Sequence, residues 1–169
     1  KPIFTDIQSS LLCDPRKIKW LPIENIHLTL SFLGNIITEN IPQLIHSIEN
    51  IIDHTHFSVF IENTGVFPSI SFPKILWLGV DNTHKKLTKL HKQVEKAVVL
   101  LKENKKNENF IPHITLGRIN LSYGKIDVLP FMKYVYSPIE LDVNSIALFE
   151  SKLLPDGGKY KVVSNFPLN

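Results

Sequence analysis

Two stretches of the sequence carry a histidine and a threonine separated by a single residue. The first stretch contains His27 and Thr29, and the second, about half a chain length later, contains His113 and Thr115. Because side chains alternate between the two faces of a β-strand, the histidine and threonine of each stretch would share one face. Apolar residues alternate with them, so the opposite face would pack on a core. The repeat predicts two imidazoles and two hydroxyls that serve one site.

Two imidazoles are suited to an in-line displacement at phosphorus. Near neutral pH, one ring can be neutral and accept a proton from the attacking oxygen, while the other is protonated and donates to the departing oxygen. Each role contributes on the order of 10²–10⁴-fold to the rate. The hydroxyls of Thr29 and Thr115 can hold the non-bridging phosphate oxygens, where negative charge concentrates. A phosphate bound between the two rings would raise the pKa of both histidines.

A single histidine–threonine pair on a strand is ordinarily a polar residue beside a good strand former. Here the pair occurs twice with similar apolar flanks, and a glycine, Gly34 or Gly117, closely follows each copy. This recurrence favours shared chemistry over two unrelated polar positions.

The composition indicates one compact globular domain, residues 1–169, because 43% of the 169 residues are hydrophobic. The formal net charge of +3 suits a phosphate-bearing ligand. The only cysteine, Cys13, excludes an internal disulfide and favours a reducing, cytoplasmic location. We expect it to fill a helix face rather than act as a nucleophile. No apolar run approaches the roughly 20 residues of a membrane span, and no signal peptide opens the chain.

Hydrophobic periodicity predicts a mixture of helices and strands. We expect a loop that carries Trp20 before the first motif, and Thr38 is a candidate N-cap of the next helix. A loop with Gly65 and Pro68 is expected between two strands, and the last short helix should be interrupted near Pro130. Because helices and strands do not alternate regularly, we expect an α+β fold with largely antiparallel strands. The predicted helices are 2–12, 38–52, 82–104 and part of 125–136; the predicted strands are 26–34, 57–62, 74–80, 111–119, 140–150 and 160–163, with a hairpin turn at 156–158.

The remaining histidines and motifs give weaker signals. His54 and His56 have a spacing seen in metal sites, but no carboxylate or cysteine completes a ligand set, so we expect no metal. His46, His84 and His91 are expected on solvated helix faces. The sequence has no Walker A, Gly-x-Gly-x-x-Gly or Gly-x-Ser-x-Gly motif, so we expect no nucleotide cofactor and no serine-hydrolase site.

The motif-bearing stretches resemble the 2H phosphoesterase superfamily, and most of all its RNA 2′,3′-cyclic phosphodiesterases, historically called 2′-5′ RNA ligases. The similar stretches cover most of the chain in the right order: 20–34, 74–80, 110–118, 148–151, 157–160 and 166–168. The resemblance implies a bilobed α+β fold with pseudo-two-fold symmetry, largely antiparallel sheets and outer helices. Each lobe would supply one motif to a cleft between them, and no metal would be needed.

In that family the reaction opens a 2′,3′-cyclic phosphate at an RNA end or on a nucleotide, usually leaving a 2′-phosphomonoester. Carried over by motif position, His27 would protonate the departing 3′ oxygen and His113 would activate water. Thr29 and Thr115 would hold the phosphate. The two histidine roles exchange if the other phosphorus–oxygen bond breaks. The resemblance also implies possible 2′-5′ RNA ligation in reverse. As to oligomeric state, we expect a monomer.

The sequence departs from the family pattern at several places. The strand that usually precedes the first helix is not present, which would leave a sheet edge exposed. Lys74 stands where arginine is common, and basic residues are sparse after Arg118, so we expect short substrates rather than long RNA. Phe72 and Phe149 are candidates for stacking on a base.

Two other functions remain open from the sequence. The first is a nucleotide- or RNA-binding module that keeps the site without turnover. The second is hydrolysis of 2′-5′ linked oligoadenylates or of a cyclic ADP-ribose phosphate. The motifs do not separate these substrates, because they would bind the phosphate and not the base.

Overall fold

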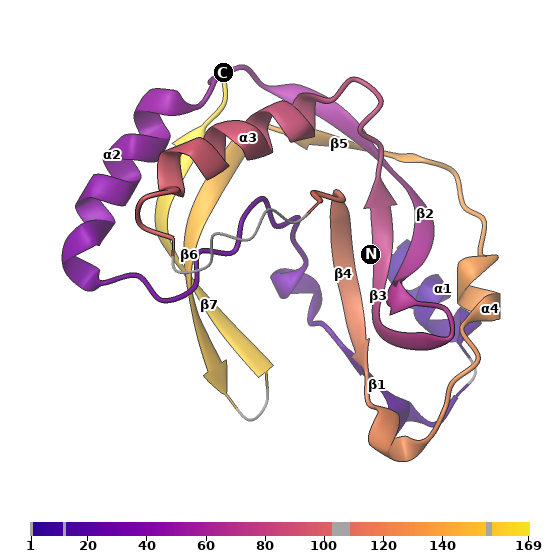
Figure 1. Ribbon diagram of the computed structural model, residues 1–169. Coiled ribbons are helices and arrows are strands. Elements are labelled where there is room, and N and C mark those ends of the chain that lie inside the picture. The colour runs from indigo at the N-terminus through magenta and orange to yellow at the C-terminus, as the bar shows by residue number, and fades with distance from the viewer. Residues whose placement is uncertain (1, 12, 103–108, 155–156) are drawn as a thin grey trace. The chain divides into compact units, whose positions relative to one another are not determined.

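The computed structural model describes residues 2–11, 13–102, 109–154 and 157–169 (Figure 1). The chain forms two compact units, and each is built from three separate segments. The first unit takes residues 1–29, 60–81 and 112–140, and the second takes residues 30–59, 82–111 and 141–169. Helices and antiparallel strands together confirm the predicted α+β class. The predicted duplication stays a prediction.

A five-stranded sheet has the order β1-β4-β3-β2-β5. The pairs β1–β4, β4–β3 and β3–β2 are antiparallel, and β3 lies between two neighbours, as its continuous apolar run predicts. The predicted loop at Trp20 is wrong, because this residue ends β1 and pairs with Gly117 of β4. The strands are β1 (Ile18–Trp20), β2 (Phe57–Ser69), β3 (Phe72–Val80), β4 (His113–Ile119) and β5 (Ile139–Val143).

Three register shifts bend the central strands and leave one extra residue each at Asn63, Lys74 and Leu116. Between the first two shifts, β2 and β3 continue through the region where the sequence predicts a loop around Gly65 and Pro68. That prediction is wrong, because a proline at a register shift need not donate a hydrogen bond to the ladder. β2 and β3 therefore form one long hairpin.

The core of the first unit lies between the sheet and two helices, α1 (Pro2–Ser10) and α4 (Leu129–Met132). α1 confirms the first predicted helix, and its Ile7 is fully buried. The buried hydroxyl of Thr64 donates to the carbonyl of Phe131 at 2.8 Å, which ties β2 to α4. Pro130 lies in the first turn of α4 and does not interrupt it, because a helix needs no N–H there.

The second unit contains two longer helices that pack on each other, α2 (Ile41–Ile51) and α3 (Lys86–Val98). Both confirm predicted helices, and their buried residues recur at helical spacing. Thr38 is not the N-cap of α2, because it lies in a 3₁₀ turn and α2 begins after Asn40. The buried side chains on or beside the two helices are Leu44, Ile48, Ile52, Leu87, Leu90, Val94 and Val98.

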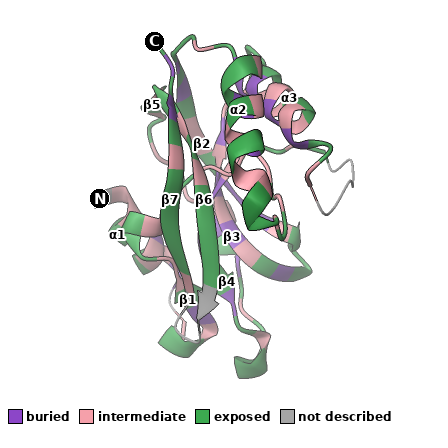
Figure 2. Cartoon of the chain, turned by 90° about the vertical axis from the view of Figure 1, so that its left-hand side faces the viewer, coloured by how far each residue is buried: buried purple, intermediate pink, exposed green. Residues whose placement is uncertain are grey.

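A second sheet consists of the hairpin β6 (Ser145–Leu154) and β7 (Gly157–Pro167), much of which is exposed (Figure 2). The hairpin prediction is confirmed, although Asp156 of its predicted turn lies outside the described residues. The single strand predicted for 140–150 is wrong, because β5 ends at Val143 and β6 is a separate strand. No helix in the described part of the chain is both long and apolar enough to span a membrane.

His54 connects the end of α2 to the end of β7. Its Nδ1 lies 2.9 Å from the carbonyl oxygen of Pro167, and its Nε2 lies 3.0 Å from that of Glu49. Both carbonyls can be satisfied at once only by the protonated ring, in which both nitrogens donate. These two hydrogen bonds, Pro167 first, raise the pKa of His54 above its ordinary value near 6.5.

We expect the His54→Ala substitution to cost more stability at acidic than at alkaline pH. Because the pKa is raised in the folded state, the contribution of His54 is fully present below about pH 6.5 and declines as pH rises through the folded value. Urea unfolding of the wild type and the variant at pH 5.5 and 8.5 measures this, with His56→Ala as the control. If the free energy of unfolding of the wild type and of His54→Ala differed by the same amount at both pH values, the prediction would be contradicted.

Candidate active site

The first motif does not form the predicted strand over residues 26–34. Only Leu28 pairs, in an isolated antiparallel β-bridge with Ile114 of β4. The alternating pattern predicts a strand only if its apolar face packs on a core. Phe32, which belongs to that apolar face, is 75% exposed. The second motif does lie in a strand, β4, and its Ile114 and Leu116 are buried as predicted.

The Leu28–Ile114 bridge brings the two motifs together. Continued by one residue on either side, this antiparallel register would set His27 opposite Thr115 and Thr29 opposite His113. These four residues flank the bridged pair, so this register would place them on the face opposite to it. All four belong to the first unit.

His27 has a defined ring tautomer. Its Nδ1 lies 2.7 Å from the carbonyl oxygen of Asn25, which ends a 3₁₀ turn two residues earlier. A carbonyl only accepts, so Nδ1 carries a proton and donates it. Nε2 is the other ring nitrogen of this exposed side chain.

Two aromatic side chains contact the ring of His113. The ring of Phe67 meets it edge-on, with centroids 5.0 Å apart and an interplanar angle of 87°, and Trp77 lies at 6.1 Å. Trp77 is also paired opposite Thr115 in the β3–β4 register. The sequence analysis did not identify Phe67 or Trp77 as site residues, because their position depends on cross-strand register rather than on local pattern. Together they form an aromatic wall beside His113.

The aromatic wall depends on Gly65. A Cβ atom at this position would overlap the indole ring of Trp77, so only glycine fits. The indole Nε1 is buried and has no hydrogen-bond partner among the described residues. The contact between Trp77 and Phe67, at 5.0 Å between centroids, completes the wall from β2.

The other predicted contact residues are found on β3, β4 and β6. Lys74 is the extra residue of a bulge and its ammonium sits 5.0 Å from the ring centroid of Phe72. Arg118 is exposed and pairs with Ile75, the neighbour of Lys74, so two cations lie near one end of β3 and β4. Phe149 belongs to the second unit, where it meets Tyr160 edge-on at 6.3 Å.

The predictions for the remaining histidines are mostly confirmed. His46 is exposed on α2, as expected, and His84 is exposed but lies in a turn before α3 rather than on the helix. His91 is different: it is half-buried, and its ring contacts two other segments, so its predicted place on a solvated face is wrong. Both ring nitrogens of His54 contact backbone carbonyls. Within the described ranges, no three or more histidine, cysteine or acidic residues are grouped to hold a metal ion.

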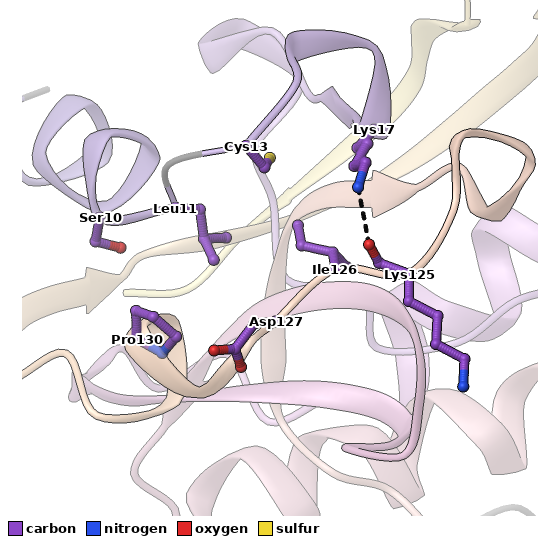
Figure 3. A pocket seen from close by; sticks show the side chains of 8 residues that line it. All are labelled: Ser10, Leu11, Cys13, Lys17, Lys125, Ile126, Asp127 and Pro130. Carbon is purple, nitrogen blue, oxygen red and sulfur yellow. Dashed lines mark hydrogen bonds between the residues drawn. The ribbon is translucent and has the colours of Figure 1, made fainter.

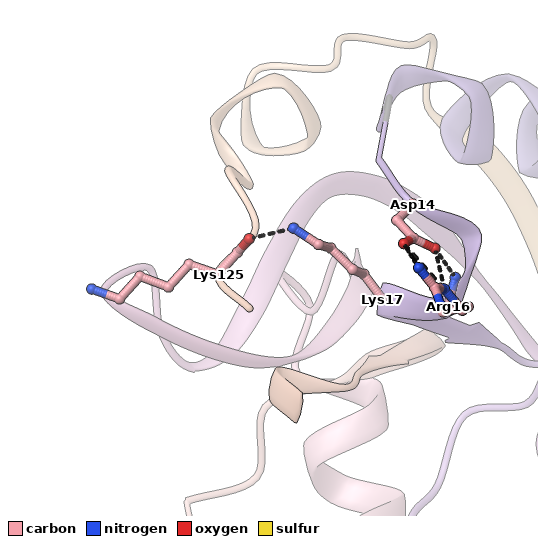
Figure 4. A network of polar contacts seen from close by, with 4 residues as sticks. All are labelled: Asp14, Arg16, Lys17 and Lys125. Atoms are coloured by element: carbon pink, nitrogen blue, oxygen red, sulfur yellow. Dashed lines mark hydrogen bonds and ion pairs between the residues drawn. The ribbon is translucent and has the colours of Figure 1, made fainter. Parts of the chain in front are cut away.

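A pocket of about 410 Å³ lies in the first unit between the end of α1 and the segment before α4 (Figure 3). Lys17 donates to the carbonyl of Lys125 beside it at 2.9 Å, and Arg16 pairs nearby with Asp14 (Figure 4). Burial raises the pKa of Cys13. The predicted place of Cys13 on a helix face is wrong, because α1 ends at Ser10 and Cys13 lines this pocket. The lining residues include no motif residue: Ser10, Leu11, Cys13, Lys17, Lys125, Ile126, Asp127 and Pro130.

Comparison with known proteins gives one family. A model described as the 2′-5′ RNA ligase superfamily matches residues 14–153. The RNA 2′,3′-cyclic phosphodiesterase of Aquifex aeolicus is 34% identical over 159 residues, covering 89% of this chain and 81% of that protein. The protein of the same name from Thermotoga maritima is 32% identical over 145 residues, covering 85% and 76%.

Solved structures show the same fold. The crystal structure of TT0787 of Thermus thermophilus has a TM-score of 0.79 at 25% identity and covers 99% of this chain and 90% of that one. The structure of E. coli LigT complexed with 3′-AMP has a TM-score of 0.72 at 20% identity and covers 96% and 91%. The likeness to LigT concerns the fold alone.

We expect the Gly65→Ala substitution to destabilise the protein by about 1–3 kcal/mol, because the added methyl must displace the ring of Trp77. Urea unfolding measures the change, and the tryptophan emission maximum reports the movement of the ring. Ser69→Ala, at an exposed position of the same strand, is the control and should lie within about 0.5 kcal/mol of the wild type. A Gly65→Ala protein with unchanged stability and emission would contradict the role given to this glycine.

Proposed function

Because this chain belongs to the 2′-5′ RNA ligase superfamily, as its sequence resemblance indicated, we propose that it is an RNA 2′,3′-cyclic phosphodiesterase. One observation supports the mechanism: Leu28 of the first motif bridges Ile114 of the second, and antiparallel register continued from this pair would set His27 opposite Thr115 and Thr29 opposite His113. In this arrangement two imidazoles and two hydroxyls face one small region. When water attacks a phosphate, the imidazoles can transfer the protons and the hydroxyls can bind the phosphate oxygens.

The reaction adds one water molecule across one phosphorus–oxygen bond. His113, neutral at the start, accepts a proton from the water, whose oxygen bonds to phosphorus. The bond from phosphorus to the 3′ oxygen breaks, and His27, protonated at the start, gives its Nε2 proton to that oxygen. The product is a 2′-phosphomonoester with a free 3′ hydroxyl. Proton exchange with solvent then restores both rings.

The surroundings of the two histidines support these roles. The hydrogen bond from Nδ1 of His27 to Asn25 leaves Nε2 as the atom that donates to the substrate. Phe67 and Trp77 contact the ring of His113, which restricts its orientation toward the phosphate. The hydroxyls of Thr29 and Thr115 donate to the non-bridging oxygens.

The distribution of charge supports a short substrate. Lys74 and Arg118 are exposed near one end of β3 and β4, several residues from His113 along the strand. Two cations can hold the phosphate next to a chain end, but a long RNA gains affinity from many phosphate contacts. We infer that the substrate is an RNA end or a nucleotide. Run backwards, the same proton transfers would join a 2′-phosphate to a hydroxyl and release one water molecule.

Phosphorus NMR on 2′,3′-cyclic AMP with a chelator present is expected to show conversion to the 2′-phosphate. The reason is that the two side chains supply both proton transfers, so added chelator should leave the rate unchanged. A 3′-phosphate product would keep the reaction class and exchange the two histidine roles. If the nucleotide binds but no product forms, the chain is a nucleotide-binding module and the proposed function is wrong.

We expect His27→Ala and His113→Ala each to lower kcat for 2′,3′-cyclic AMP by about 10²–10⁴-fold, because each removes one proton transfer. Initial rates measured with equal amounts of folded protein test this. His46→Ala and His84→Ala, which remove exposed histidines elsewhere, should keep the wild-type rate. Wild-type turnover by either motif variant would overturn the assignment.

A further inference from the structure

One ring on α3 contacts the flanks of both motifs. The Nδ1 of His91 donates to the carbonyl oxygen of Leu30 at 2.8 Å. The same ring stacks face to face on Phe110, with centroids 4.2 Å apart and planes only 4° from parallel. Leu30 directly follows Thr29, and Phe110 precedes His113 by three residues. His91 therefore contacts one segment that leads out of the first motif and one that leads into the second.

These contacts stabilise a segment after the first motif that has little regular secondary structure. Residues 29–37 contain no helix or strand, and the first motif pairs with β4 only through Leu28. One bridge fixes the position of Leu28 but does not by itself fix the backbone direction beyond it. The hydrogen bond at Leu30 supplies a second fixed point two residues later. With two fixed points, the intervening Thr29 has little freedom to move.

The next residue, Ser31, is anchored by a lysine that follows the same helix. Lys102, whose side chain is only 12% exposed, places its ammonium 3.3 Å from the hydroxyl of Ser31 and 2.9 Å from the carboxylate of Glu95. The ion pair with Glu95 of α3 keeps the buried lysine charge balanced. Leu30 and Ser31 are thus both held by α3 or by the residues that follow it.

The second motif is fixed in a comparable way from its other side. Phe110 rests on His91, and two residues later the carbonyl of Pro112 accepts from the backbone N–H of Val80 at 3.1 Å. β4 then begins at His113. The direction in which the chain enters β4 is therefore set by the stack on His91 and by the bond to β3.

We propose that His91 is a positioning residue, which fixes the flanks of both motifs and so holds Thr29 and His113 at the phosphate. This inference rests on the proposed function. His91 itself does not touch the substrate in this account. Its effect is geometric, and a displacement of a reacting group by about 1 Å can cost on the order of 10²-fold in rate.

Three substitutions separate the two contacts of His91. His91→Ala removes both, His91→Asn keeps a side-chain donor, and His91→Phe keeps an aromatic ring for Phe110. We expect His91→Ala to lower kcat for 2′,3′-cyclic AMP by about 10–100-fold, while Asn and Phe each restore part of the loss. The pH–rate profile should keep its shape, because His91 transfers no proton to the substrate. The control is His84→Ala, which removes an exposed histidine just before α3 and should behave as wild type.

A second readout does not require turnover. In ¹⁵N–¹H spectra of the unliganded protein, His91→Ala should shift the amide signals of Thr29 and His113, and His84→Ala should leave both in place. Wild-type kcat together with unmoved Thr29 and His113 signals in His91→Ala would overturn the positioning role. If the wild type shows no turnover, the proposed function fails, and the amide shifts alone still decide whether His91 positions the motifs.

Discussion

The proposed active site depends on one short backbone contact, the antiparallel bridge between Leu28 and Ile114. Ile114 is 5% exposed, so its side chain fixes which face of β4 is buried. A slip of the pairing by one residue would direct His113 into the core and bring apolar side chains to the site. In the proposed site, burial of an apolar residue therefore orients the strand that carries His113. The chemistry of the polar face is set by the packing of the face behind it.

The sequence predicted the parts of the fold in which burial follows a regular period. β4, α2 and α3 formed as expected, because their apolar residues recur at the spacing of a strand or a helix and are buried. The first motif has the same alternation but only a single bridged residue, since exposed Phe32 has no core to enter. Its proposed chemistry rests on residue types and stays a prediction, whereas its backbone conformation could not be predicted from the alternation.

Other features of the site depend on contacts between segments that are distant in sequence. Trp77 borders His113 because of the β3–β4 register, which a bulge at Leu116 alters. His91 lies on a helix face that looks solvated when α3 is considered alone. It is covered because the loop after the first motif and Phe110 reach it. Local patterns contain no information about which loop crosses which helix face, so these roles became visible only in the fold.

The most direct test of this account is whether one phosphate contacts both histidines. Carbon-13 NMR can follow the ring Cε1 signals of His27 and His113 during titration with adenosine 2′-monophosphate, with exposed His46 and His84 as internal references. The account predicts that His27 and His113 shift together with one dissociation constant, because a bound phosphate stabilises the protonated form of both rings. A shift of only one of them, or two different dissociation constants, would contradict a shared phosphate site.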